Sequence, residues 1–134
     1  MTAAQRVIEA FNTLNPDTSI FAPESVTWHS FDESEVPTIP DTFAALRAFR
    51  SVSPDFRFND ARCEETDGDL SWARYVLSGT LPDGSTFRAP AALAVITGSD
   101  GRVVRLEEFV DQHQVAPLVI ALGVAGHNVG DTGQ

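Results

Sequence analysis

The segment Val103-Val104-Arg105-Leu106-Glu107-Glu108-Phe109-Val110-Asp111 predicts a β-strand with two unlike faces. One face is apolar apart from a single carboxylate and consists of Val104, Leu106, Glu108 and Val110. The other face is mixed and consists of Val103, Arg105, Glu107 and Phe109. A charged group on an apolar face is costly unless another group pairs with it. Glu108 is therefore predicted to be either a member of a structural ion pair or a working group in a pocket.

Three further strands are predicted before this segment. The first opens at Phe56 and continues toward Cys63, the second covers residues 70–80, and the third covers residues 87–97. Pro90 lies inside the third strand, where we expect a bulge or a sheet edge. Turn residues separate the strands, in the runs Asp67-Gly68, Pro82-Asp83-Gly84-Ser85 and Gly98-Ser99-Asp100-Gly101. Consecutive hairpins of this kind predict an antiparallel sheet.

The remaining sequence is mainly helical in pattern. Apolar spacing and flanking turn residues predict helices over residues 3–14, 17–22, 41–52 and 115–122. Thr2 is a candidate cap for the first helix, and Asp41 or Thr42 for the third. Residues 26–31 predict a strand. The acidic residues 32–37 indicate a loop, which is either a solvated connection or a functional lid.

Helices that precede a series of hairpins are typical of an α+β domain. We predict a single domain over residues 1–122, with a bent antiparallel sheet wrapped around the early helices. A glycine-rich tail over residues 123–134 is expected to be disordered. Such a sheet can leave a pocket between its concave face and the helices.

The composition limits the classes of function. The 134-residue chain is 43% apolar, which suits a globular protein, and its net charge of −10 argues against nucleic-acid binding. All nine basic residues are arginine, which excludes lysine Schiff-base chemistry. Cys63 is the only cysteine and the three histidines show no compact ligand spacing, so we expect no metal and no cofactor. Without a signal-peptide pattern or a membrane-length apolar run, we expect a cytoplasmic protein with no membrane partner.

Four local signatures follow one another along the chain. They are Val26-Thr27-Trp28-His29, then Phe43-Ala44-Ala45-Leu46 in a helix, then a strand from Tyr75 to Ser78-Gly79-Thr80, and finally Asp100-Gly101-Arg102-Val103-Val104 leading to Glu108-Phe109-Val110-Asp111. In this order they resemble the nuclear-transport-factor-2-like (SnoaL-like) superfamily, over about residues 3–122. The resemblance implies a cone-shaped curved sheet around N-terminal helices, a pocket for a small lipophilic ligand, and a homodimer. It does not fix a reaction, because enzymes and non-enzymatic modules share the fold.

The catalytic pattern of the steroid isomerases of this superfamily is not matched. Those enzymes have an Asp after the first strand, an acidic residue on the penultimate strand and a Tyr on the first helix. The corresponding places here hold Ser30, apolar residues around Leu93, and Phe11.

The pattern of limonene-epoxide hydrolases is similar to this sequence in part. Their Tyr-His-Asn, Arg-x-Asp and Arg-Asp-Tyr-Phe-Asp motifs correspond to Trp28-His29-Ser30, Arg74-Tyr75-Val76 and Glu107-Glu108-Phe109-Val110-Asp111. The resemblance thus implies catalytic roles for Glu108 and Arg74, with Trp28 and Ser30 beside the substrate. Val76 stands where the family has its second Asp, which breaks the family's two-carboxylate relay.

Arg74, like Glu108, is a lone charge in apolar company on its strand face. Because both strands belong to one curved sheet, we expect the two side chains to meet, and Arg74 to favour the ionised carboxylate. The functional interpretation makes Glu108 a general base or water activator oriented by Arg74. The structural alternative is a buried ion pair without chemistry. The residues expected to contact the substrate are Trp28, Ser30, Trp72, Val76, Leu106 and Val110.

Three other polar residues near these motifs receive different predictions. His29 alternates away from Trp28 and Ser30 along its strand, so a packed or interface histidine is favoured over a catalytic one. Asp111 is favoured as a helix cap over a catalytic acid, because Gln114 follows it at capping-box spacing. Tyr75 alternates away from Arg74, which favours core or interface packing.

Two functions remain open from the sequence. The first is a cofactor-independent acid–base enzyme, namely a hydrolase, cyclase, dehydratase or isomerase, acting on a small lipophilic molecule such as a terpenoid or polyketide-like intermediate. The second is a ligand-binding or dimeric accessory module without catalysis. The outer face of the sheet, which includes Arg105, Glu107 and Phe109, is the expected dimer surface.

Overall fold

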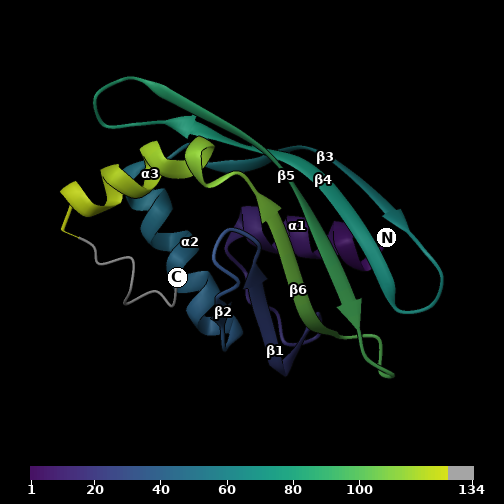
Figure 1. The fold of residues 1–134 in the computed structure, drawn as a ribbon. Helices are drawn as coiled ribbons and strands as arrows, with labels where there is room; N and C mark the ends of the chain where they lie inside the picture. The colour runs from purple at the N-terminus through teal and green to yellow at the C-terminus, as the bar shows by residue number, and fades with distance from the viewer. Residues whose placement is uncertain (127–134) are drawn as a thin grey trace.

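A computed structural model describes residues 1–126, and across them three helices pack against one curved sheet of six strands (Figure 1). The predicted α+β class, with a bent sheet around N-terminal helices, is confirmed. The elements in chain order are α1 (Ala3–Thr13), β1 (Phe21–His29), β2 (Glu35–Val36), α2 (Ile39–Val52), β3 (Arg57–Glu65), β4 (Leu70–Thr80), β5 (Thr86–Thr97), β6 (Val103–Val110) and α3 (Gln112–Val124). No helix in these residues is long and apolar enough to cross a membrane.

β6 lies inside the sheet, whose strand order is β2-β1-β6-β5-β4-β3. The strands from β3 to β6 pair antiparallel with their neighbours, as the predicted hairpins require. β1 instead pairs with β6 in parallel, which differs from the purely antiparallel sheet that we expected. A parallel pair is possible here because α2 and four strands separate β1 from β6 in the chain. This pairing sets His29 directly opposite Glu108.

The first helix begins as predicted. The Thr2 side chain accepts a hydrogen bond from the backbone N–H of Gln5, and the Gln5 side chain accepts one from the backbone N–H of Thr2, which completes a capping box. Helix α2, which is the third of the predicted helices, begins earlier than we expected. Its cap is Thr38 rather than Asp41 or Thr42, because Pro40 fits the first helical turn and needs no N–H partner there.

Two predictions for the N-terminal part of the chain are wrong. Residues 17–22 do not form a helix, because the Asp17 carboxylate accepts a hydrogen bond from the N–H of Ser19 and closes a local turn. β1 then starts at once with the buried residue Phe21. The acidic loop also contains a short strand, β2, whose Val36 pairs with Thr27 of β1.

The C-terminal helix is longer than predicted. α3 begins at Gln112, because Asp111 caps it, and continues through Gly123 to Val124. The helix was predicted to end at Leu122, so its end is two residues further along than predicted. The tail predicted to be disordered falls mainly on residues 127–134, which lie outside the described residues.

The hairpins form where the turn residues predicted them. Gly68 and Gly84 both have positive φ angles, +75° and +86°, which a side chain would disfavour. β3 also contains an irregularity that the sequence did not indicate. The register slips between Asn59 and Arg62, where Asp60 has a φ of 55°, so an extra residue bends the strand. A bend of this kind increases the curvature of the sheet around α1.

Candidate functional site

A cavity of about 240 Å³ lies between the helix-facing side of the sheet and helices α2 and α3. Its wall is mostly apolar, with four phenylalanines from four different parts of the chain, namely Phe11, Phe31, Phe49 and Phe58. The polar side chains on its wall are Thr27, His29, Asp32, Thr42, Glu108 and Gln112. A predominantly apolar cavity with a few convergent polar groups is the usual form of a small-molecule site.

Glu108 lies on the wall of this cavity, as its apolar strand face predicted. Its side chain is 14% exposed, and its Oε2 accepts a hydrogen bond of 2.5 Å from the hydroxyl of Tyr75. Tyr75 is itself buried. Burial, followed by the negative charge of Glu108 and the hydrogen bond to it, raises the pKa of Tyr75 well above its ordinary value. The phenol therefore remains a hydrogen-bond donor and fixes one oxygen of the carboxylate.

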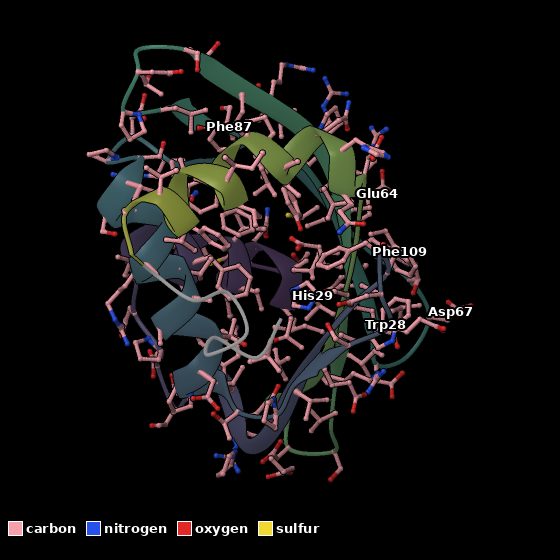
Figure 2. The ribbon with its side chains drawn as sticks, turned by 60° about the vertical axis from the view of Figure 1, so that its left-hand side comes forward. Trp28, His29, Glu64, Asp67, Phe87 and Phe109 are labelled. Carbon is pink, nitrogen blue, oxygen red and sulfur yellow. The ribbon has the colours of Figure 1, made fainter. Side chains whose placement is uncertain are left out.

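His29 faces the second oxygen of the same carboxylate. Its Nε2 lies 3.9 Å from Oε1 of Glu108, which is too far for a direct hydrogen bond, and its side chain is 11% exposed. Its Nδ1 is buried and has no hydrogen-bond partner. Unpaired buried polar atoms are uncommon, and at a cavity wall they mark a place where a ligand atom can bind. Figure 2 shows His29 on the side of the sheet that faces the helices.

The strand register explains why these three side chains converge. His29 of β1 stands opposite Glu108 of β6, and Glu108 stands opposite Leu93 of β5, so the side chains of His29, Glu108 and Leu93 point to the same face of the sheet. Tyr75 pairs with Ala91 of β5, one step further along that face. β1 turns its Thr27 and His29 inward, so His29 is packed as predicted in that its side chain is largely buried, but it lies on the cavity wall rather than on the face away from the site.

The predicted pairing of Arg74 with Glu108 is wrong. Arg74 is exposed on the outer face of β4, whereas the inner face of that strand carries Ala73, Tyr75 and Leu77, all buried. Trp72 and Val76 face outward with Arg74, and α1 packs close to the inner face at Ser71. The N–H of Ala4 donates a hydrogen bond of 3.2 Å to the Ser71 hydroxyl, which a larger side chain at that position would prevent.

Trp28, Trp72 and Val76 were predicted to contact the substrate, and this prediction is wrong. Alternation along their strands points them to the outer face of the sheet, as it does Arg74. All three residues lie on the outer face of the sheet, half-buried. The ring of Phe109 lies 5.5 Å from that of Trp28 and 6.0 Å from that of Trp72. Figure 2 shows Trp28 and Phe109 on the side opposite to His29.

The other four predicted site residues each have a different place in the structure. Val110 lines the cavity as expected, whereas Leu106 shares its face but is fully buried in the core. Ser30 is beside the cavity rather than in its wall. Its N–H donates to the carbonyl of Glu108, and its hydroxyl accepts from the N–H of Val110. Asp111 caps α3 by accepting a hydrogen bond from the N–H of His113, as the favoured interpretation predicted.

Two residues of the site were not identified from the sequence. Tyr75 was assigned to packing, because nothing local shows that it reaches a carboxylate two strands away. Asp32 was placed in an acidic loop, yet it lines the cavity next to Phe31. The side chain and the backbone N–H of Ser34, together with the nearby His29, lower the pKa of Asp32. Asp32 is thus an ionised group at the exposed end of the cavity.

The site has the groups for proton transfer. One carboxylate oxygen is held by a buried phenol, and the other lies 3.9 Å from an imidazole nitrogen, so that both can contact one atom or two neighbouring atoms of a ligand. Among the described residues, no group of three or more histidine, cysteine or acidic side chains is arranged to hold a metal ion.

The sequence matches no family model and no curated protein. Solved structures with the same fold do exist. One is an NTF2-like protein from Burkholderia thailandensis, with a TM-score of 0.71 and 19% identity, covering 89% of this chain and 98% of that one. Another is a candidate SnoaL-like polyketide cyclase from Shewanella denitrificans, with a TM-score of 0.68 and 15% identity, covering 89% and 95%.

A third similar structure is a phenazine biosynthesis-related protein from Pseudomonas aeruginosa. Its TM-score is 0.67 and its identity 16%, and the match covers 88% of this chain and 81% of that one. At these identities the likeness shows a shared fold, and the function has to be argued from the site.

Proposed function

From the nuclear-transport-factor-2-like (SnoaL-like) fold of this chain and the chemistry of its cavity, we propose that the protein is a small-molecule acid–base enzyme in which Glu108 is the proton acceptor. The observation that carries the proposal is a largely buried carboxylate on an apolar cavity wall, held at one oxygen by Tyr75. A carboxylate in such surroundings is costly for stability, which favours a working role over a purely structural one.

Each group has its own role in this proposal. Oε1 of Glu108, the oxygen that Tyr75 does not hold, accepts a proton from a carbon or a water molecule placed beside it. Tyr75 keeps the carboxylate in position through Oε2. His29, 3.9 Å from Oε1, donates or accepts a proton at a second atom of the substrate. A proton removed at one atom and delivered at another is the step shared by isomerisation, cyclisation and dehydration.

The substrate that fits this cavity is small and mostly apolar. A volume of about 240 Å³ lies just below the usual range of about 300–1,000 Å³ for small-molecule sites. The phenylalanine side chains of the wall offer no hydrogen bonds, so the polar atoms of the substrate must lie toward the polar side chains of the wall, such as Glu108, His29 and Asp32. A small lipophilic molecule with one activated carbon–hydrogen bond has this character.

Exchange of carbon-bound protons tests the proposal. We expect the protein to accelerate the replacement of the α-protons of 2-tetralone, or of another small lipophilic ketone shown to bind, by deuterium in D₂O, followed by proton NMR. Glu108→Gln keeps the shape and removes the base, so the rate should fall by about 10²–10⁴-fold. Glu107→Gln is the matched control, because Glu107 binds Arg105 on the outer face.

Two outcomes would contradict the proposal. Unchanged exchange in Glu108→Gln would remove Glu108 from the chemistry. Ketones that bind in the cavity, as seen by shifts in the protein NMR spectrum, but do not exchange would favour the non-catalytic ligand-binding module instead.

A further inference from the structure

The charges on the cavity wall are of one sign. Asp32 and Glu108 are carboxylates, and among the described residues of the wall only His29 can become a cation. No arginine lies on the wall, and the chain contains no lysine. The net charge of the whole chain is −10. An anionic substrate would therefore meet no fixed positive charge at this site.

The exposed end of the cavity combines a carboxylate with an aromatic ring. Asp32 and Phe31 are neighbours in the chain and both line the cavity, Asp32 exposed and Phe31 half-buried. Phe31 also lies next to His29, with 5.5 Å between the ring centroids. Asp32 stays ionised because the side chain and N–H of Ser34 lower its pKa. A ring face and a carboxylate together favour an organic cation, through cation–π attraction and charge pairing.

We propose that the substrate of this cavity is a lipophilic organic cation, an amine or quaternary ammonium compound, whose charged group binds between Phe31 and Asp32 while its apolar body extends toward Glu108. The inference rests on the proposed function only in taking this cavity as the substrate site. It pairs the cation with the exposed Asp32, so that Glu108 remains free to accept a proton.

Three probes of similar shape and different charge test this inference. They are choline, 3,3-dimethyl-1-butanol and 3,3-dimethylbutanoate, which carry a positive, a zero and a negative charge. Their affinities are measured by two-dimensional NMR titration of the labelled protein, following the amides of residues 29–34 and 106–112. We expect choline to bind about tenfold more tightly than the alcohol, and the carboxylate to bind most weakly.

Substitutions in the loop and on the cavity wall test which side chain causes the preference for choline. Asp32→Asn should reduce the preference for choline by about fivefold, the size expected for an exposed ion pair. Glu33→Gln is the matched control, because it removes one charge from the same loop at a residue outside the cavity wall, and it should leave the preference unchanged. His29→Gln should leave it unchanged or increase it, since it removes the only side chain of the wall that can become a cation.

The inference is overturned if the alcohol binds as tightly as choline, or if Glu33→Gln weakens choline binding as much as Asp32→Asn. These outcomes are independent of the proposed function, because the probes do not react. A preference for choline together with unchanged deuterium exchange in Glu108→Gln would retain the cation site and reject the base. The reverse result would retain the base and reject the cation site.

Discussion

The hydroxyl of Tyr75 donates a hydrogen bond to Oε2 of Glu108 although β5 separates their strands. Ala91 of β5 stands opposite Tyr75 of β4 on one side and opposite Val110 of β6 on the other. Its small side chain leaves space for the tyrosine ring to extend across β5. The bond links the buried inner face of the sheet to the cavity. It also offsets part of the cost of holding a carboxylate in apolar surroundings.

Replacing Tyr75 by Phe leaves Oε2 of Glu108 without its donor. We expect the free energy of unfolding to fall by about 1–3 kcal/mol, the usual cost of an unsatisfied buried acceptor of this kind. Urea denaturation measures this change. The double variant with Glu108→Leu serves as the control, because position 108 then has no acceptor for the Tyr75 hydroxyl and most of the loss should disappear. Equal losses in the two backgrounds would show that the bond does not stabilise the fold.

Tyr75 also predicts how stability changes at alkaline pH. Its pKa is raised in the folded protein by burial, and then by the charge of Glu108 and the hydrogen bond to it. The stabilisation is therefore complete below the ordinary tyrosine pKa of about 10. It is lost as the pH rises above that value, because only the unfolded chain releases the proton.

The ionisation of Tyr75 can be followed without interference, because Tyr75 is the only tyrosine and the chain has no lysine. Tyrosinate absorbance should appear together with unfolding rather than before it. A Cys63→Ser background is the control, because burial also raises the pKa of the Cys63 thiol. Titration of the tyrosine in a folded protein at its ordinary pKa would contradict the buried placement.

Replacing His29 by Leu should separate stability from activity. Nδ1 of His29 is buried without a partner, so its removal should leave the free energy of unfolding unchanged or raise it. Deuterium exchange of a bound ketone should fall, because the group opposite Oε1 of Glu108 is lost. The exposed His113 provides the control, and His113→Ala should leave exchange unaffected. A destabilised His29→Leu protein would show that the imidazole is part of the packing.

Two substitutions at Asp111 distinguish a cap from a catalytic acid. Asp111→Ala removes the acceptor for the N–H of His113 and should lower stability by about 1 kcal/mol. Asp111→Asn keeps a capping oxygen and removes the charge, so stability and deuterium exchange should both remain near those of the natural protein. Loss of exchange in the Asn variant alone would assign Asp111 to the chemistry.

The outer face of the sheet is where we expect a second copy to bind. Phe109 is 40% exposed there and contacts Trp28 and Trp72. If the protein is a dimer through this face, Phe109→Arg should convert it to monomers in analytical ultracentrifugation, because a charge would be buried at the interface. Val124→Arg on α3 is the control, since Val124 is 85% exposed. A dimer unaffected by Phe109→Arg would place the interface elsewhere.

Much of the fold could be predicted because the signals for it are local. The four strands from β3 to β6 lie between turn residues that can be recognised in the sequence, and β4 covers the predicted residues 70–80. Thr2 and Asp111 cap helices because their side chains bond to N–H groups only a few residues away. The segment 17–22 was mistaken for a helix because Phe21 pairs with Val103 of β6 and its ring packs against Phe11 and Phe43, contacts that no local pattern indicates.

The candidate site was only partly predictable, for a different reason. Alternation in β4 separates Trp72, Arg74 and Val76 from Ala73, Tyr75 and Leu77, but it does not show which set faces the helices. Because Arg74 is a lone charge among apolar side chains, we predicted that its face lines the pocket, which is wrong. The close approach of α1, marked by the contact between Ala4 and Ser71, favours a small side chain at that inner position.

The sequence by itself determined that Glu108 is a carboxylate on an apolar strand face, because side-chain alternation depends only on the chain around it. The tertiary structure decided which residues it meets. The parallel pairing of β1 with β6 sets His29 opposite Glu108, and the order of β4, β5 and β6 sets Tyr75 within reach of its Oε2. Neither arrangement has a local signal, because strand pairing and helix packing depend on burial across the whole domain.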